Sequence, residues 1–208
     1  MPDRRVVRPF ARGDRVTLGF DGSRYNDATA LVAVRPEDRH TKVLGLWEQP
    51  LDDDGWEVPA DEVEETVADA HERFTVLRAY ADPPYWREDV DRWCGRWDVW
   101  RKWETARRRP MAAAVRSFDE LIRAGAMSIE DDELSAGLVR HLVNAQKRML
   151  TLRDDEGRFL WTIGKKAPKS PLKIDARVAG ILAHEAAGDA IAAGALKRAV
   201  RHKASVII

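Results

Sequence analysis

Residues 16–34, VTLGFDGSRYNDATALVAV, decide the fold of this 208-residue chain. The run 16–20 is apolar and rich in β-branched residues, and it ends in the turn signal Asp21-Gly22-Ser23. A second apolar run spans 28–34, and a third spans 43–47. Only short polar links separate the three runs, whereas parallel strands need long crossover connections. The stretch therefore predicts the first two strands of a three-strand antiparallel meander.

Beyond the meander the chain changes to alternating helices and strands. Val63, Val67 and Ala70 recur at helical spacing within 59–73, which predicts an amphipathic helix. The apolar run 76–81 then ends in Asp82-Pro83-Pro84, which stops strands and helices alike. The remaining predicted elements are helices at 85–95, 110–124 and 131–146, a strand at 97–103, a hairpin around 154–157, a Lys-rich loop at 164–173 and a last helix from 171 or 173 to 188. This order predicts an α/β fold, in which three antiparallel strands and then parallel strands form a mixed central sheet flanked by helices.

The charge of the chain balances only as an average. Lys plus Arg number 35 and Asp plus Glu number 35, and a net charge of zero taken alone argues against a nucleic-acid binder. The segment 48–72, however, holds eleven acidic residues and no Lys or Arg, and 158–177 holds six basic residues against one acid, a local charge of +5. We therefore expect a polarised protein whose acidic helix faces away from DNA, with a modest affinity for DNA that falls with salt.

The remaining composition bounds the protein class. Hydrophobic residues make up 44% and charged residues 34%, enough for one domain with a sizeable core. The only cysteine, Cys94, cannot form an internal disulfide or a thiolate zinc site. Neither a leader with an apolar core nor a run of about 18 apolar residues occurs, so we expect a soluble intracellular protein without membrane contact.

Three aspartates stand out by their positions. Asp21 and Asp82 each end a predicted strand, and Asp175 lies at the start of the last helix. In open α/β sheets, sites form outside the carboxyl ends of strands, so the three carboxylates are expected to converge there. Like charges so close would repel, and a hard divalent cation such as Mg²⁺ or Mn²⁺ would relieve the repulsion. Taken singly, each also fits a structural role, as a turn former or as an acid favoured by the helix dipole.

Three segments that contain these aspartates together resemble a known protein family. The segments 16–34, LRAYADPPYW (77–86) and KSPLKIDARVAGILAHEAA (169–187) resemble, in the same order, the three acidic motifs of the nuclease domain of phage terminase large subunits. The stretch 140–170, RHLVNAQKRMLTLRDDEGRFLWTIGKKAPKS, also resembles the part of that family before its third motif. The resemblance implies an RNase H-like fold and a metal-dependent endonuclease that cuts concatemeric double-stranded viral DNA during packaging. Asp21, Asp82 and Asp175 would then hold two Mg²⁺ or Mn²⁺ ions, with Asp21 bridging them.

The resemblance also implies an organisation and partners. We expect an arm or linker at 1–14, the nuclease domain at 15–195 and a basic C-terminal tail at 196–208. The phosphate-binding motif G-x-x-x-x-G-K-[ST] is missing, so the ATPase domain of a whole large subunit is not expected in this chain. The implied partners are DNA, that ATPase domain, the portal protein and the small terminase subunit, in the cytoplasm of the infected bacterial host.

Several other residues admit a functional and a structural interpretation. Lys165, Lys166, Lys169 and Lys173 lead directly to Asp175 and would pair with DNA phosphates or simply be solvated. His141 is expected as a satisfied core histidine or as an outer-shell, water-orienting group, and Asp27 as a loop residue or an outer-shell carboxylate. The run Arg107, Arg108 and Arg109 is interpreted as solvated, and the five tryptophans between 86 and 103 as core. Within 131–146, one predicted apolar face contains Leu134, Leu138, Leu142 and Ala145.

Two other functions stay open at this level. A different RNase H-like nuclease, such as a junction resolvase or a hybrid-specific RNase H, would share the fold and the acidic residues. A non-catalytic docking module of the packaging motor would share the fold but would not need to bind metal.

Overall fold

The computed structural model describes residues 7–25, 27–50, 53, 55–167 and 170–197. A six-stranded mixed sheet forms its centre, in the order β5-β4-β1-β2-β3-β6, and a separate two-stranded sheet is formed by β7 and β8. The strands are β1 (Arg15–Gly22), β2 (Ala28–Arg35), β3 (His40–Glu48), β4 (Thr75–Ala81), β5 (Trp100–Lys102), β6 (Ser128–Ile129), β7 (Gln146–Arg153) and β8 (Phe159–Gly164). The helices are α1 (Ala60–Arg73), α2 (Arg87–Arg96), α3 (Arg108–Arg123), α4 (Glu133–Asn144) and α5 (Asp175–Ala192).

The predicted sheet is confirmed. β1, β2 and β3 form an antiparallel meander, β4 pairs in parallel with β1, and β5 pairs in parallel with β4. α1 supplies the crossover connection that the parallel β1–β4 pair requires. The sequence analysis missed β6, a two-residue strand that pairs in parallel with β3, because two residues carry no periodicity.

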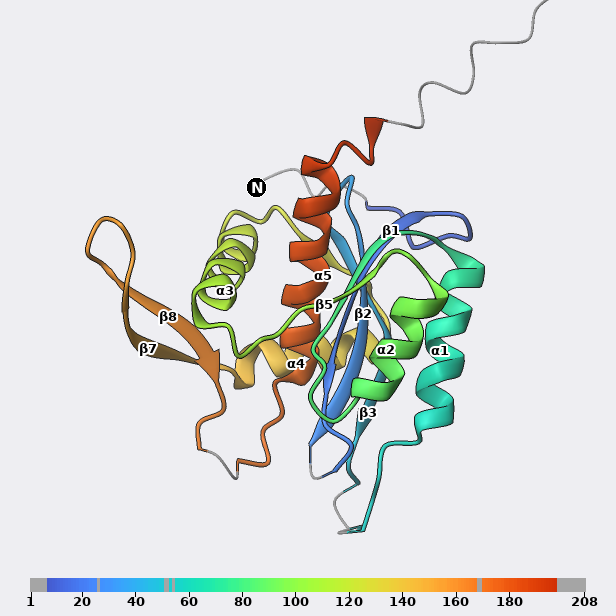
Figure 1. Ribbon diagram of the computed structural model, residues 1–208, viewed down its shortest axis with the longest axis horizontal. Helices are drawn as coiled ribbons and strands as arrows, with labels where there is room; N and C mark the ends of the chain where they lie inside the picture. Colours follow the sequence, from blue (N-terminus) through green and yellow to red (C-terminus); the bar gives the residue numbers. More distant parts are fainter. Residues whose placement is uncertain (1–6, 26, 51–52, 54, 168–169, 198–208) are drawn as a thin grey trace, which may run out of the picture.

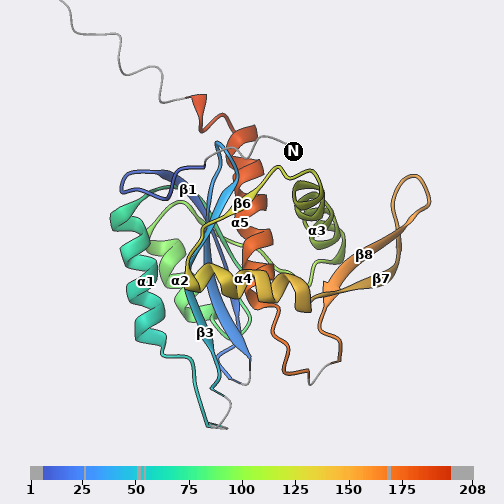
Figure 2. The same ribbon diagram turned by 180° about the vertical axis from the view of Figure 1, so that it is seen from behind.

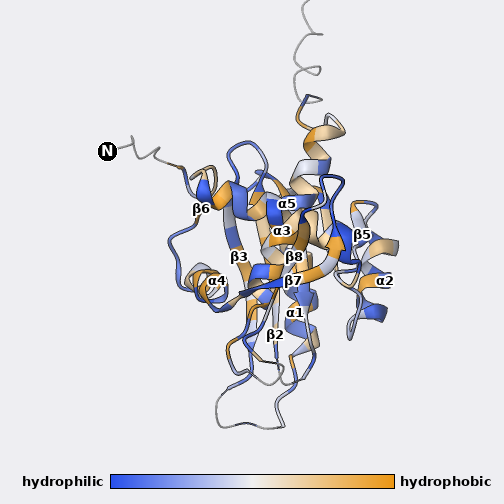
Figure 3. Cartoon of the chain, turned by 90° about the vertical axis from the view of Figure 1, so that its left-hand side faces the viewer, coloured by the Kyte–Doolittle hydropathy of each residue, from blue (hydrophilic) through white to orange (hydrophobic). Residues whose placement is uncertain are grey.

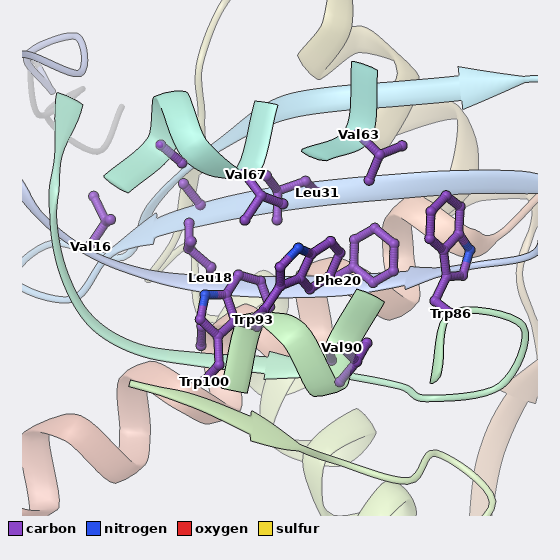
Figure 4. Packing of buried hydrophobic residues seen from close by; sticks show 14 of the residues in the cluster. Val16, Leu18, Phe20, Leu31, Val63, Val67, Trp86, Val90, Trp93 and Trp100 are labelled. Carbon is purple, nitrogen blue, oxygen red and sulfur yellow. The ribbon is translucent and has the colours of Figure 1, made fainter. Parts of the chain in front are cut away.

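Helices cover both faces of the sheet. α1 and α2 lie on one face, while α5 crosses the other, with α3 beyond it (Figures 1 and 2). The predicted tryptophan core is on the α1–α2 face, where Trp86, Trp93 and Trp100 are each at most 1% exposed (Figure 4). Phe20 of β1 meets Trp93 edge-on, with ring centroids 4.9 Å apart. Three of the five predicted tryptophans therefore fill this layer, while Trp97 packs there partly buried and Trp103 is partly buried against residues of α3 and α5.

The opposite face is packed through small residues. A Cβ added to Gly19 of β1 would lie 2.0 Å from the carbonyl oxygen of Ala179 in α5. Thr17, also on β1, donates its hydroxyl to the carbonyl of Ala183 at 2.8 Å. α5 is buried on almost every side, not only on the face that contains Val178 and Leu182. This close approach fixes α5 against the backbone of β1, and with it the place of the residue at its start.

Two further predictions concern the apolar face of α4 and the hairpin. In α4, Leu138 is fully buried as predicted, but Leu134 is 44% exposed, because Ser135 is the residue of the first turn that faces the sheet, where it accepts the backbone N–H of Val43 at 3.2 Å. The predicted hairpin is confirmed as β7–β8, which projects away from the central sheet (Figure 1).

No helix in the described part of the chain is long and apolar enough to cross a membrane.

The expected N-terminal arm and C-terminal tail are only partly within the described residues. Phe10, within the expected arm, stacks on His40 of β3 with ring centroids 5.3 Å apart, and Asp14 forms ion pairs with Arg8 and Arg35. Residues 1–6 and 198–208 lie outside the described residues. The described portion of the arm thus packs against the sheet.

Candidate active site

The three predicted aspartates gather at one edge of the sheet. Asp21 is the penultimate residue of β1, Asp82 directly follows β4, and Asp175 is the first residue of α5. Because β1 and β4 are parallel, their carboxyl ends meet, and the backbone N–H of Asp82 donates to the carbonyl of Phe20 at 3.1 Å. Asp27, which immediately precedes the antiparallel β2, reaches the same edge.

The electrostatics of this edge reflect burial and crowding of like charges. Burial raises the pKa of Asp21 well above its usual range, and the nearby charges of Asp175, Asp82 and Asp27 raise it further. Burial, with the charge of Asp27, raises the pKa of Asp175 to about 7. A hydrogen bond joins the carboxyl groups of Asp27 and Asp175. The four acids therefore form one interacting cluster, which favours any cation that enters it.

Two of the predicted lysines contact this cluster. Lys165 forms an ion pair with Asp27, and the Lys173 ammonium lies 3.6 Å from the other Asp27 oxygen. Burial raises the pKa of Asp27, but the hydrogen bond and charge of Lys165 outweigh it and leave this pKa below its usual value. Lys166 is exposed, and Lys169 lies outside the described residues. The Lys-rich loop thus delivers charge to the carboxylates themselves.

Thr105 is a site residue that the sequence analysis missed. It lies between β5 and α3, donates its hydroxyl to Asp82, and donates its backbone N–H to the same carboxylate at 3.4 Å. Burial raises the pKa of Asp82, and the bonds from Thr105 counteract part of that rise. Nothing in the local sequence around Thr105 signals this contact, because it depends on where β5 ends in the sheet.

His141 connects the end of β3 to the start of α5. It is 1% exposed, its Nδ1 accepts the backbone N–H of Ala176 at 2.9 Å, and its Nε2 lies 3.0 Å from a Glu48 carboxylate oxygen. Since Nδ1 accepts, Nε2 carries the proton and donates to Glu48. The hydrogen bond from His141, together with the charge and hydrogen bond of Arg140, lowers the pKa of Glu48. His141 is thus a satisfied buried histidine, and it holds the residue that follows Asp175.

The donor set suits a hard divalent ion. Asp21, Asp27, Asp82 and Asp175 offer only carboxylate oxygens, the ligands that Mg²⁺ and Mn²⁺ prefer. Within the described residues, no three acidic, histidine or cysteine side chains already surround a single point as metal ligands. Asp82 accepts hydrogen bonds from Thr105, and Asp27 pairs with Lys165, so a metal ion would bind carboxylates that already have partners in the chain.

Known proteins share both sequence and structure with this chain. No protein-family model matches it. The Gene 13 proteins of Mycobacterium phages L5 and D29 are 33% and 32% identical over 193 and 191 residues, which cover 89% and 88% of this chain. The chain spans about a third of the length of these curated relatives, 31% of each.

Solved structures with a similar fold were found for this chain. The large terminase nuclease from thermophilic phage G20c superposes with a TM-score of 0.55 at 12% identity, over 86% of this chain and 90% of that one. This chain has the fold of a large terminase nuclease. The nuclease domain of Thermus phage P74-26 matches with a TM-score of 0.52 at 12% identity, over 81% of this chain and 77% of that one. The G20c large terminase nuclease with bound magnesium matches with a TM-score of 0.52 at 12% identity, over 86% and 89%. The RNase H-like fold expected from the sequence is confirmed.

Proposed function

We propose that this chain is the nuclease part of a phage large terminase and cuts double-stranded viral DNA concatemers during genome packaging, in a reaction that depends on a divalent metal. The observation that carries the proposal is the cluster of Asp21, Asp82 and Asp175 at the carboxyl edge of the β1–β4 pair. The likeness to terminase nucleases supports it through the fold. We propose the residues 15–195 as the nuclease domain.

Asp21, Asp82 and Asp175 would hold two Mg²⁺ or Mn²⁺ ions, with Asp27 beside them. Bound there, the ions would supply an activated water and stabilise the leaving oxygen of the phosphodiester. Burial raises the pKa of Asp21 and brings the pKa of Asp175 to about 7, and a divalent cation in the cluster would favour the charged form of both carboxylates. That the large terminase nuclease from G20c has been solved with bound magnesium supports this assignment.

The surrounding residues of the chain keep the carboxylates in place. His141 fixes the first turn of α5 and so the position of Asp175, and Thr105 holds the Asp82 carboxylate. Lys165 partly balances the charge of the cluster and would exchange Asp27 for a DNA phosphate when the substrate binds. We propose Lys166, Lys169 and Lys173 as further contacts of the DNA backbone.

The proposed setting is the packaging motor in the cytoplasm of the infected host. There the chain would act with an ATPase domain, a portal protein and a small terminase subunit. The support is the terminase fold together with the phage origin of the relatives that match in sequence.

Plasmid cleavage tests the proposal. The wild-type chain is expected to nick and linearise supercoiled plasmid with Mn²⁺ or Mg²⁺, and Asp21→Asn should abolish this activity. Asp61→Asn provides a matched control, because Asp61 is an exposed carboxylate on α1, in the layer on the other side of the sheet from α5, and it should cut like the wild type. Undiminished cutting by Asp21→Asn would refute the site.

The same assay separates the alternatives when the substrate is varied. A strong preference for a four-way junction or an RNA·DNA hybrid over duplex DNA would indicate a different RNase H-like nuclease. Failure to bind Mn²⁺ in a calorimetric titration would favour a non-catalytic docking module.

A further inference from the structure

The arginine run at the start of α3 lies closer to the candidate active site than its sequence suggests. Arg107 follows Thr105 by two residues, and Thr105 contacts the carboxylate of Asp82 through both its hydroxyl and its backbone N–H. Two residues of extended chain span at most about 7 Å, so the run begins within one side-chain length of the candidate site. Its position is therefore fixed by the active-site loop.

The three arginines have no counter-ion among the described residues. Arg107, Arg108 and Arg109 are exposed, and none of them forms an ion pair with any residue that the structure describes. Arg109 donates instead to the backbone carbonyl of Arg153, at 3.0 Å. Arginines on the α1–α2 side differ, since Arg73, Arg92 and Arg96 each pair with a carboxylate of α1.

The uncompensated charge continues onto the hairpin beside α3. Lys147 lies over the Trp161 ring at 4.6 Å, Arg153 lies over the Phe159 ring at 3.6 Å, and Arg148 donates to the carbonyl of Lys166 at 2.9 Å. Within the described chain none of the three basic side chains meets a carboxylate, and β7 contains hydrophilic residues as well as apolar ones (Figure 3). In the acidic turn of the hairpin, Asp154 and Glu156 are paired with Arg158, while the exposed Asp155 forms no ion pair with any of these basic side chains in the described structure.

We call this surface the arginine face and define it by six residues: Arg107, Arg108, Arg109, Lys147, Arg148 and Arg153. Six exposed cations that pair with no carboxylate among the described residues repel one another, so the surface favours a ligand that brings several negative charges at once. Arginine matches phosphate with two parallel hydrogen bonds, which makes a nucleic-acid backbone the fitting ligand.

We propose that the arginine face binds the phosphate backbone of duplex DNA that flanks the cut site, on the α3 side of the aspartate cluster. This inference rests on the proposed nuclease function and adds a second DNA contact to the Lys-rich loop. It also assigns the hairpin a role as the outer part of that contact. The loop that contains Thr105 then serves both the metal site and the DNA contact, because Thr105 bonds to Asp82 and Arg107 follows two residues later.

Fluorescence anisotropy of a labelled DNA duplex with Ca²⁺, measured between 50 and 200 mM salt, tests the inference. If each of three arginines neutralises one phosphate, the triple variant R107A/R108A/R109A loses about 2.7 from the slope of log affinity against log salt. The wild type should then lose roughly 40-fold more affinity than the variant across that range. The matched control is R73A/R92A/R96A, which removes the same number of arginines from the opposite side and should keep the wild-type slope.

The outcomes separate this inference from the proposed function. A triple variant with the wild-type slope, while the wild-type chain cuts plasmid, overturns the arginine face and leaves the nuclease intact. Equal losses in the triple variant and in the control also overturn it, because they would reflect net charge alone. A wild-type chain that neither binds nor cuts DNA overturns both. The single variants R107A and R108A, each expected to lose about 0.9 from the slope, provide the same test if the triple variant does not fold.

Discussion

The two faces of the central sheet are built on opposite principles. On the α1–α2 face, large aromatic side chains such as Trp86, Trp93 and Trp100 fill a thick apolar layer. On the α5 face, alanines and glycines bring helix and strand backbones into direct contact, and buried polar groups such as Thr17 bond to the helix. The first face supplies volume and thus stability, whereas the second supplies precise placement of Asp175 against Asp21 and Asp82.

The largest expected effect comes from removing volume on the aromatic face. Trp93→Ala should lower the free energy of unfolding by about 3 to 5 kcal/mol, because it deletes a fully buried ring that also bonds to Glu64. The DNA-cleaving activity per folded molecule should persist at low temperature. Urea unfolding alongside plasmid cleavage checks both, and a loss of activity in folded protein would contradict the division between the faces.

On the α5 face, adding a side-chain atom between strand and helix should instead destabilise the fold and displace α5. Gly19→Ala places a methyl group 2.0 Å from a backbone oxygen of α5, which must shift. We expect about 1 to 3 kcal/mol of destabilisation. Unlike Trp93→Ala, this change should weaken Mn²⁺ binding in the protein that stays folded, because it displaces the helix that begins with Asp175. Calorimetric titration with Mn²⁺ measures the binding, and wild-type affinity in Gly19→Ala would show that the contact does not set the site.

Acid should also weaken the α5 face. Burial, with the charge of Arg39, lowers the pKa of His184 to about 3, and its Nε2 lies 2.9 Å from the Thr41 hydroxyl. The unfolded chain takes up a proton below pH 6.5 but the folded chain does not, so stability contributed by neutral His184 is lost as pH falls from about 6.5 toward 3. Between pH 7.5 and 5.0 this amounts to about 2 kcal/mol.

The variant His184→Gln isolates this contribution, since glutamine can replace the bond to Thr41 without titrating. The difference in unfolding free energy between the wild type and this variant should shift by about 2 kcal/mol against the wild type from pH 7.5 to 5.0. A difference that stays constant with pH would show that His184 titrates alike in the folded and unfolded chain.

A further prediction concerns the bond between His141 and the start of α5. His141→Gln should cost about 1 to 3 kcal/mol of stability, since it leaves the Ala176 N–H without its acceptor. A merely structural histidine would affect stability alone, whereas we expect Mn²⁺ affinity to fall about tenfold as well. Calorimetric titration of the folded variant decides between these outcomes.

Much of the fold follows from the sequence, and so does the place of the three aspartates. Apolar runs and turn residues predicted the meander, and strand ends predicted that Asp21 and Asp82 lie at one edge. The partners of these acids did not follow. Thr105 reaches Asp82 only because β5 pairs with β4, and Glu48 meets His141 only because α4 crosses the end of β3.

The sequence shows which regions carry a net charge, but it does not show which charged residues pair with one another. The acidic segment of α1 and the basic approach to Asp175 were visible as runs. The sequence could not indicate that Lys165 and Lys173 contact Asp27, whereas Arg107 and Arg108 lack an ion pair within the described residues. Such pairing depends on tertiary contacts, which local composition does not encode.

The aspartate cluster is the proposed binding site for the metal ions of the nuclease. Crystals soaked in Mn²⁺ and measured at the manganese absorption edge test it most directly. We expect anomalous peaks about 2 Å from carboxylate oxygens of Asp21, Asp82 and Asp175. Manganese bound elsewhere, or no peak at this edge of the sheet in crystals of protein that cuts DNA with Mn²⁺, would contradict it.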